Sequence, residues 1–230
     1  MTELWYGLIR AIELIINFDP EVMQIAGKSL AFAVISCTLA TLIFLPLGSI
    51  IHFNRFYGKR VLLNIIQTLY SVPTVAVGLF VFVFISNAGP FGKLGLLFTP
   101  AAIVIGQVLL ISPVITGLTI SALSGVDKTV NETAASLGAN RLQATILVIR
   151  EARFAILAAL IMGFGRAVSE VGLSLMVGGN IKGFTRTITT AISLETSKGD
   201  LELSLALGMI LIFLALVINI ALNRIQHRKE

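Results

Sequence analysis

Five long apolar runs, separated by short polar segments, limit what this chain can fold into more than any other feature. A helix of about 20 apolar residues crosses the hydrocarbon core of a bilayer and satisfies its own backbone polar groups there. With 56% hydrophobic and only 13% charged residues, the composition excludes an ordinary soluble domain. We therefore predict an all-α polytopic membrane protein. Its five predicted transmembrane helices are residues 27–51, 61–86, 100–123, 152–177 and 203–222.

Residues 1–20 predict an additional helix that lies in the membrane interface. Leu8 and Ile12 belong to one apolar helical stripe, and charged residues lie off that stripe. Trp5 and Tyr6 are aromatic residues of the kind that anchor a helix at the membrane surface. The segment is too short and too polar to span the bilayer.

A polar segment, residues 123–151, separates the third predicted span from the fourth. Asp127 or Thr129 can cap a helix by accepting hydrogen bonds from its first free N–H groups. Glu132 is expected to favour the positive end of the same helix. Gly138 and Asn140 then predict a turn, after which a second short helix begins.

The two predicted short helices carry features of a docking element. Small residues precede Leu137, and the second helix carries Leu142 and Ile146. A short exposed helix with a small-residue face and a hydrophobic tip is suited to insertion into a groove on another protein. The alternative is an ordinary solvated loop.

The net charge of +5 does not indicate nucleic-acid binding, because the basic residues lie at the ends of apolar runs. Their distribution instead predicts the orientation of the chain in the membrane. Their clusters place the N-terminus outside and both the C-terminus and the 123–151 segment in the cytoplasm. No Gly-rich phosphate loop followed by Lys-Ser/Thr is present, so we expect no ATP hydrolysis by this chain. Lone Cys37 and two separated histidines predict no metal site. The inner clusters are Arg55, Lys59 and Arg60, and Arg224, Arg228 and Lys229.

Two ionisable residues, Arg166 and Glu170, fall inside the fourth predicted span. A charge at the centre of a bilayer costs about 2.5–3.5 kcal/mol on insertion scales. Four residues apart on one helix, the two can pair with each other, or across a dimer interface, for purely structural reasons. Alternatively they line or gate a pathway, with Arg166 facing an anion. The residues leave both interpretations open.

Several motifs resemble the permease subunits of ABC importers for molybdate and tungstate. Glu132-Thr-Ala-Ala-Ser-Leu-Gly138 resembles the motif of such permeases in which Glu-Ala-Ala is followed three residues later by Gly, although Thr133 replaces the first Ala. Pro73-Thr-Val-Ala-Val-Gly78 resembles their second-span pattern. The block from Gly165 to Gly172 and the later Gly-Asn-Ile also resemble this family. Arg150-Glu-Ala-Arg153 is similar to the tungstate branch.

The resemblance implies a type I ABC importer permease fold, with residues 1–230 as a single transmembrane permease domain. It implies transport of an oxyanion, tungstate first and molybdate next. The implied partners are a second copy of the chain, two cytoplasmic ABC ATPases that hold ATP and Mg, an extracytoplasmic substrate-binding protein and the lipid of the cell (inner) membrane. The chain itself would hold no cofactor and no catalytic residue. The alternative is a self-contained secondary anion transporter or channel subunit.

The resemblance also implies roles for individual residues. The fourth-span block and the second-span proline would belong to the translocation pathway or its gate. The 123–151 segment would dock on the ATPase. The pathway residues are Pro73, Arg166, Ser169 and Glu170, and the coupling residues are Glu132, Thr133, Ala134, Ala135, Ser136, Leu137, Gly138 and Asn140.

Overall fold

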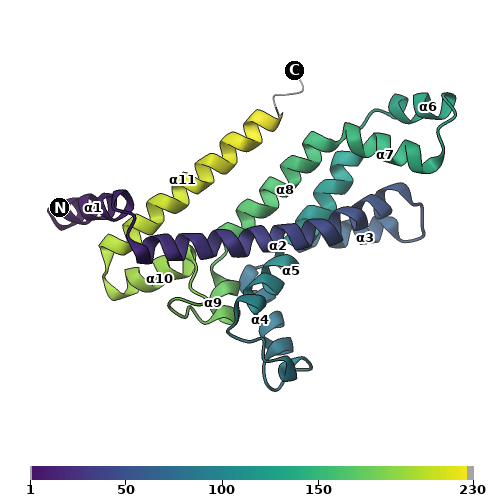
Figure 1. Cartoon of the computed structure of the whole chain (residues 1–230). Helices are drawn as coiled ribbons and strands as arrows, with labels where there is room; N and C mark the ends of the chain where they lie inside the picture. Colours follow the sequence, from purple (N-terminus) through teal and green to yellow (C-terminus); the bar gives the residue numbers. More distant parts are fainter. Residues whose placement is uncertain (1, 227–230) are drawn as a thin grey trace.

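The computed structural model describes residues 2–226, and every regular element in that range is a helix (Figure 1). The elements are α1 (Thr2–Ile16), α2 (Pro20–Phe53), α3 (Lys59–Leu69), α4 (Thr74–Ile85), the 3₁₀ helix η1 (Gly92–Leu94), α5 (Pro100–Ser124), α6 (Lys128–Ser136), α7 (Arg141–Glu151), α8 (Arg153–Val168), α9 (Gly172–Gly178), α10 (Ile188–Lys198) and α11 (Leu201–Gln226).

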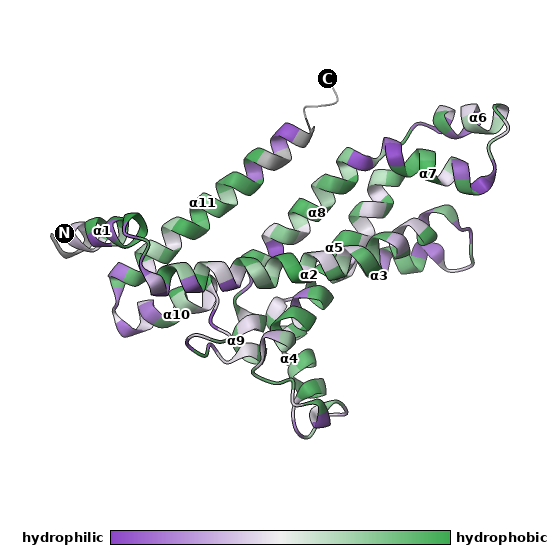
Figure 2. Cartoon of the chain, in the orientation of Figure 1, coloured by the Kyte–Doolittle hydropathy of each residue, from purple (hydrophilic) through white to green (hydrophobic). Residues whose placement is uncertain are grey.

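The described helices provide up to five spans, which confirms the predicted all-α membrane fold. Three of them, α2, α5 and α11, are long and apolar enough to cross a bilayer alone. The helix pairs α3–α4 and α8–α9 each pass the same test as one bent span. Figure 2 shows hydrophobic residues along most of these helices and hydrophilic residues concentrated on α6, α7 and α10.

Helix α5 is the centre of the bundle. Within its most apolar stretch 67% of the residues are buried, against 22% for α2 and 17% for α11. It packs against α2, α3, α4, α8 and α9. The apolar residues of α2 and α11 that the described part of the chain leaves exposed are suited to contact with lipid or with another membrane chain.

Helix α2 begins at Pro20, several residues before the predicted start of the first span. The Asp19 carboxylate accepts hydrogen bonds from the N–H groups of Glu21 and Val22, at 2.9 and 3.1 Å. Pro20 occupies the first helical turn, where its missing N–H costs nothing. Local capping therefore sets this helix start.

The second predicted span is broken into α3 and α4, which meet at 101°. Pro73 is the N-cap of α4 and has no N–H to continue a helix from α3. Tyr70 closes α3, and its side chain lies so close to α5 that a Cβ on Gly117 would overlap the Tyr70 hydroxyl. The interruption predicted at Pro73 is thus a sharp change in the direction of the chain.

The fourth predicted span is also broken, and the prediction of one continuous helix over residues 152–177 is wrong there. Helix α8 ends at Val168, and α9 continues after a 58° bend. The break frees backbone groups that are satisfied within the protein. Gln107 donates to the carbonyl of Ala167 at 3.1 Å, and its own amide oxygen accepts from Ser36 at 2.8 Å.

Helices α4, α5 and α9 pack closely around Leu173, which is fully buried. A Cβ on Gly78 would lie 2.9 Å from the Leu173 Cα, and one on Gly106 would lie 2.5 Å from the Leu173 side chain. These glycines allow the backbones to approach as small residues do in membrane helix packing. The α4–α9 contact therefore joins the second halves of the two broken spans.

The two ends of the molecule are built differently (Figure 1). At one end α1 packs on α11, and α10 on α11 and α2, around Ala11, Val22, Ile188 and Leu207. At the other end α6 and α7 extend beyond the ends of α5 and α8. Of the predicted inner basic clusters, Arg228 and Lys229 lie outside the described residues.

Candidate functional site: the coupling segment and the broken spans

The 123–151 segment, from here the coupling segment, forms the two predicted short helices with a tight break. Asp127 caps α6 by accepting from the N–H of Thr129 at 2.9 Å, and this hydrogen bond lowers the pKa of Asp127. Gly138 has φ +81°, the left-handed conformation that favours glycine after a helix. Asn140 then starts α7 through a reciprocal capping box with Gln143, both hydrogen bonds being 2.9 Å.

The hydrophobic tip predicted for this segment is exposed. Leu137 is 82% exposed, and Leu142 and Ile146 of α7 are also exposed. Most of the predicted coupling residues are on the surface: Glu132, Thr133, Ala135, Ser136, Leu137, Gly138 and Asn140.

Two expectations for the segment are wrong. Ala134 is only 4% exposed and faces the chain itself, so it is not available to fill a partner's groove. Glu132 is not in the first turn of α6, because the helix begins at Lys128 and the partial positive charge is confined to that turn. Glu132 is instead an exposed residue of the mid-helix.

The coupling segment is attached to the spans through a small apolar cluster. Val130 of α6 and Val148 of α7 pack with Leu123 of α5 and with Ala152 and Ile156 at the start of α8. Only Ala152 separates α7 from α8. A displacement of α6 and α7 would therefore be passed to α5 and α8 through this cluster.

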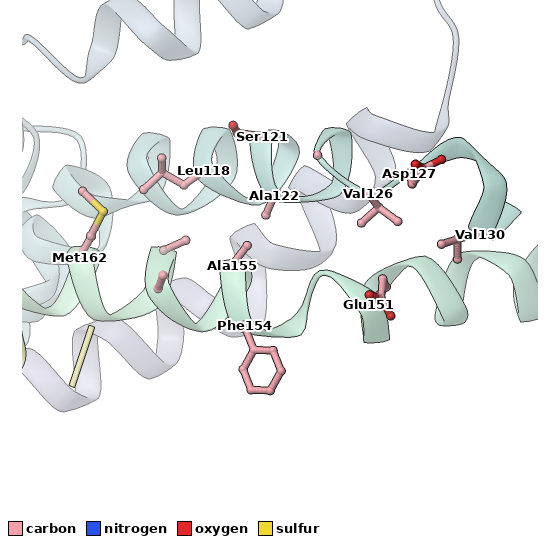
Figure 3. A pocket seen from close by; sticks show the side chains of 13 residues that line it. Leu118, Ser121, Ala122, Val126, Asp127, Val130, Glu151, Phe154, Ala155 and Met162 are labelled. Carbon is pink, nitrogen blue, oxygen red and sulfur yellow. The ribbon is translucent and has the colours of Figure 1, made fainter. Parts of the chain in front are cut away.

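A groove of about 490 Å³ runs between α5 and α8 beside that cluster (Figure 3). Leu118 and Met162 line the end far from α6, whereas Asp127, Val130 and Glu151 gather at the end nearest to α6. Phe154, at the start of α8, points away from α5 in this view. The groove thus lies between the two helices that the coupling segment joins.

Arg166 and Glu170 do not form an ion pair with each other within the described residues. They also do not share one helical face, because α8 ends at Val168. Glu170 is buried, and its carboxylate accepts from the N–H of Leu173 at 2.8 Å. Mutual pairing inside one chain is therefore excluded here by the break between α8 and α9.

Arg166 reaches the other broken span instead. Its guanidinium donates to the backbone carbonyl of Tyr70, at the end of α3, over 3.3 Å. Its Nε is buried and has no hydrogen-bond partner in the part of the chain that is described. The break in one span is thus linked to the break in the other, and the guanidinium keeps spare hydrogen-bonding capacity.

The remaining predicted pathway residues lie at the same two breaks. Ser169 is exposed, and its hydroxyl donates to the carbonyl of Arg166 at 3.2 Å. Pro73 is exposed at the start of α4. The four residues therefore occupy one region of the molecule, and their role in a pathway stays a prediction.

A buried ionic cluster near α10 was missed by sequence reasoning. Arg186 and Glu195 are almost fully buried and approach to 3.3 Å, and Lys198 lies 3.0 Å from the same Glu195 carboxylate. Arg186 also lies 3.7 Å from Glu21 of α2, which pairs with Lys182 at 2.6 Å. Glu195 and Lys198 are three positions apart on α10, whereas Arg186 lies before α10 and Glu21 lies on α2, so only the fold brings these last two to the cluster.

Threonines cap α10 and tie it to the rest of the bundle. Thr187 caps α10 in a reciprocal arrangement with Thr190. Thr185, Thr187 and Thr190 are buried. The hydroxyl of Thr189 donates to the Glu170 carbonyl at 2.5 Å, which ties α10 to the α8–α9 break.

The bundle of unbroken and broken spans is the fold of ABC transporter permeases. A permease chain in an inward-facing structure of the MetNI methionine ABC transporter superposes with a TM-score of 0.70 at 17% identity, covering 89% of this chain and 94% of that one. A chain from a bacterial alginate ABC transporter, solved with an alginate-bound periplasmic protein, gives a TM-score of 0.72 at 17% identity, covering 99% of this chain and 88% of that one.

The chain belongs to the family described as binding-protein-dependent transport system inner membrane component, whose sequence model matches residues 44–230. It is 38% identical over 221 residues to the tungstate uptake system permease protein TupB of Peptoclostridium acidaminophilum, covering 96% of this chain and 97% of the relative. It is 40% identical to the protein of the same name from Campylobacter jejuni subsp. jejuni serotype O:2, covering 96% and 92%. A probable anion ABC transporter permease of Haloferax volcanii is 39% identical, covering 90% and 91%.

This membership confirms the resemblance inferred from the motifs. It also favours the permease subunit of a multi-component transporter over the self-contained carrier or channel that the residues left open. The chain is thus a transport component of a membrane ABC system.

Proposed function

We propose that this chain is the membrane-spanning permease subunit of an ATP-driven importer of an oxyanion, with tungstate as the first candidate and molybdate as the second. The observation that carries the proposal is the coupling segment, a doubly capped helix pair that exposes Leu137 at its tip and is joined to α5 and α8. The anion is supported by the two relatives named tungstate uptake permeases.

The working transporter has several partners in this proposal. Two copies of the chain form one pathway, and each coupling segment docks on one cytoplasmic ABC ATPase that holds ATP and Mg. An extracytoplasmic binding protein delivers the anion at the end that carries α1 and α10. The distribution of basic residues supports an N-terminus outside the cell (inner) membrane and a cytoplasmic C-terminus.

Transport in this proposal is a rigid-body switch. Closure of the ATPases on ATP pushes the coupling segments, and the apolar cluster around Val130 and Val148 transmits the displacement to α5 and α8. The packed bundle responds as a unit because close-packed interfaces are bistable and not continuously deformable. The pathway then changes from inward-facing to outward-facing.

Reconstitution tests the proposal directly. The chain is co-expressed with its cognate ATPase, and the complex in liposomes is given the binding protein, ATP and tungstate. We expect tungstate uptake that requires ATP and the ATPase. Uptake by the chain alone, driven by an ion gradient, would support the self-contained carrier and reject the proposal.

A surface variant tests the coupling segment itself. Leu137→Asp places a charge on the exposed tip, so we expect loss of co-purification with the ATPase, because a desolvated charge in an apolar interface is costly. Leu94→Asp is the matched control: Leu94 is an exposed leucine in the η1 loop, remote from α6. The control should co-purify as the unmodified chain does.

A further inference from the structure

Helix α3 has three different faces, although it belongs to a membrane span. One face is buried: Ile66 packs with Ile51 and Ile120, and Tyr70 lies against the same cluster. The second face is apolar and exposed, and consists of Val61, Ile65 and Leu69. The third face is polar and exposed, and consists of Arg60, Asn64, Gln67 and Thr68; exposed Ser71 continues it in the turn after α3.

The third face, from here the α3 polar stripe, is continuous. At about 100° per residue its members fall within a sector of about 100°, and its centre lies roughly 120° from that of the apolar exposed face. The stripe extends over roughly 16 Å from Arg60 to Ser71, about half the thickness of a hydrocarbon core. It therefore runs from one membrane surface to the middle of the span, where the chain breaks.

The two exposed faces of α3 call for different surroundings. Val61, Ile65 and Leu69 are suited to lipid. The Thr68 hydroxyl donates to the Asn64 carbonyl at 2.8 Å, whereas the amides of Asn64 and Gln67 and the hydroxyl of Ser71 have no such partner among the described residues. Unpaired polar groups facing hydrocarbon are costly, so the polar stripe requires water or a polar partner at the same depth. Within the described chain, no other element covers it: its members are all exposed. The stripe consequently faces an aqueous space, either beside this chain alone or between it and the second copy.

Arg166 lies at the end of this stripe that is in the middle of the span. Its guanidinium donates to the carbonyl of Tyr70, the residue before Ser71, at 3.3 Å, and its buried Nε has no partner among residues 2–226. Arg60 lies at the surface end. No carboxylate occurs along the stripe, and nearby Glu170 is turned toward the N–H of Leu173. The surface is therefore cationic at both ends and rich in neutral donors between them.

We propose that the α3 polar stripe, together with Arg166, lines the inner half of the anion path; this rests on the proposed function. A tetrahedral oxyanion accepts hydrogen bonds and donates none. Guanidinium, amide N–H₂ and hydroxyl groups are the donors it needs, and a neighbouring carboxylate would repel it. Neutral donors between two cations bind weakly at several places, which lets an ion enter and leave.

Thiol accessibility in the assembled transporter tests this assignment. Cys37 is first replaced by serine, because it is the single native thiol. Gln67→Cys and Ser71→Cys then report on the polar stripe, and Ile65→Cys and Leu69→Cys are matched controls on the same helix. Each complex with the ATPase, in inside-out vesicles, is treated with a sulfonate-bearing or a trimethylammonium-bearing methanethiosulfonate. Rates are normalised to those of free 2-mercaptoethanol.

We expect the polar-stripe thiols to react roughly tenfold faster than the control thiols, because a thiolate forms only where water reaches it. We also expect a normalised preference for the anionic reagent of about tenfold, from the field of the two arginines. Equal rates at the two faces would overturn the aqueous path. Fast reaction with a cationic preference would overturn its assignment to anions. Absence of ATP-dependent tungstate uptake with the labelling pattern intact would reject the proposed substrate and leave the path in place.

Discussion

The guanidinium of Arg166 donates to the backbone carbonyl of Tyr70 across 96 positions of sequence and 3.3 Å of space. Each residue stands at a break, Tyr70 at the end of α3 and Arg166 two residues before the end of α8. A carbonyl at a helix end inside a membrane protein has lost its own helical donor, and the arginine replaces it. The charge that is costly in the bilayer thus stabilises the bend of another span.

A charge swap of Arg166 and Glu170 should fail to restore the protein. In Arg166→Glu with Glu170→Arg, a carboxylate would face the Tyr70 carbonyl and a guanidinium would face the Leu173 N–H, so both contacts would be repulsive. We expect the loss of stability in the double variant to equal the sum of the losses in the two single variants, with a coupling energy of less than about 0.5 kcal/mol. Membrane abundance and thermal unfolding in detergent measure this. Rescue by the swap would establish direct pairing.

Gly138 should tolerate asparagine better than valine. Its φ of +81° is strained for residues with a side chain, and a Cβ there has open space within 4 Å, so backbone strain is the main effect. The left-handed conformation costs about 1–2 kcal/mol for an ordinary residue, and asparagine adopts it more readily. We expect Gly138→Val to raise the ATP hydrolysed per anion transported, with Gly138→Asn close to the unmodified chain. Unchanged coupling in the valine variant would contradict a role for this turn.

Because of the cap at Asp127, the helical content of the coupling segment should depend on pH in the acid range and not near neutral pH. The hydrogen bond from the Thr129 N–H lowers the pKa of Asp127 below its usual value of 3.8. A carboxylate with a depressed pKa stabilises the fold fully above the unfolded value, and the contribution is lost as pH falls through the folded value. Helical content of the detergent-solubilised chain should therefore show this loss only below about pH 4.

Asp127→Asn provides the control for that cap. Asparagine is also a good N-cap but does not titrate in this range, so its variant should lack the acid-dependent component and keep coupling at neutral pH. Asp127→Ala should weaken coupling at every pH. An identical acid transition in all three proteins would show that another group titrates.

Removing the Glu195 carboxylate should destabilise the end of the bundle around α10. Arg186 and Glu195 are nearly buried at 3.3 Å, and the loss of one partner leaves a buried charge with only the more distant Glu21 at 3.7 Å. We expect Glu195→Ala to cost about 3 kcal/mol, or roughly 5–10 °C in the thermal midpoint. Lys198→Ala removes the exposed partner of the same carboxylate and should cost less than about 1 kcal/mol. Equal shifts of the thermal midpoint in the two variants would contradict the prediction that the buried partner contributes more stability than the exposed one.

Much of the fold could be predicted from local patterns. Hydropathy located the long helices, since spanning requires about 20 apolar residues whatever their neighbours are. Asp127, Gly138 and Asn140 predicted the starts and the break of α6 and α7, because caps and left-handed turns depend on residues at most three positions away. The same locality explains the early start of α2 at Pro20.

Spacing along the chain was misleading where a helix did not continue. Arg166 and Glu170 are four positions apart, which pairs side chains only on an unbroken helix. Glu170 instead accepts a hydrogen bond from the N–H of Leu173 in the first turn of α9, and α9 is held at its angle by contacts of Leu173 with Gly78 and Gly106 on two other helices. That bend depends on close packing between α4, α5 and α9, so the sequence of α8 alone does not reveal it.

The sequence by itself determined that the chain is an all-helical membrane protein and where its coupling segment begins, turns and ends. These properties follow from hydropathy and from hydrogen bonds between near neighbours. Only the tertiary structure decided what the buried charges contact: Arg166 the carbonyl of Tyr70, and Arg186 the carboxylate of Glu195. A charge in a low-dielectric interior must find a partner in space, and the packing of distant helices selects that partner.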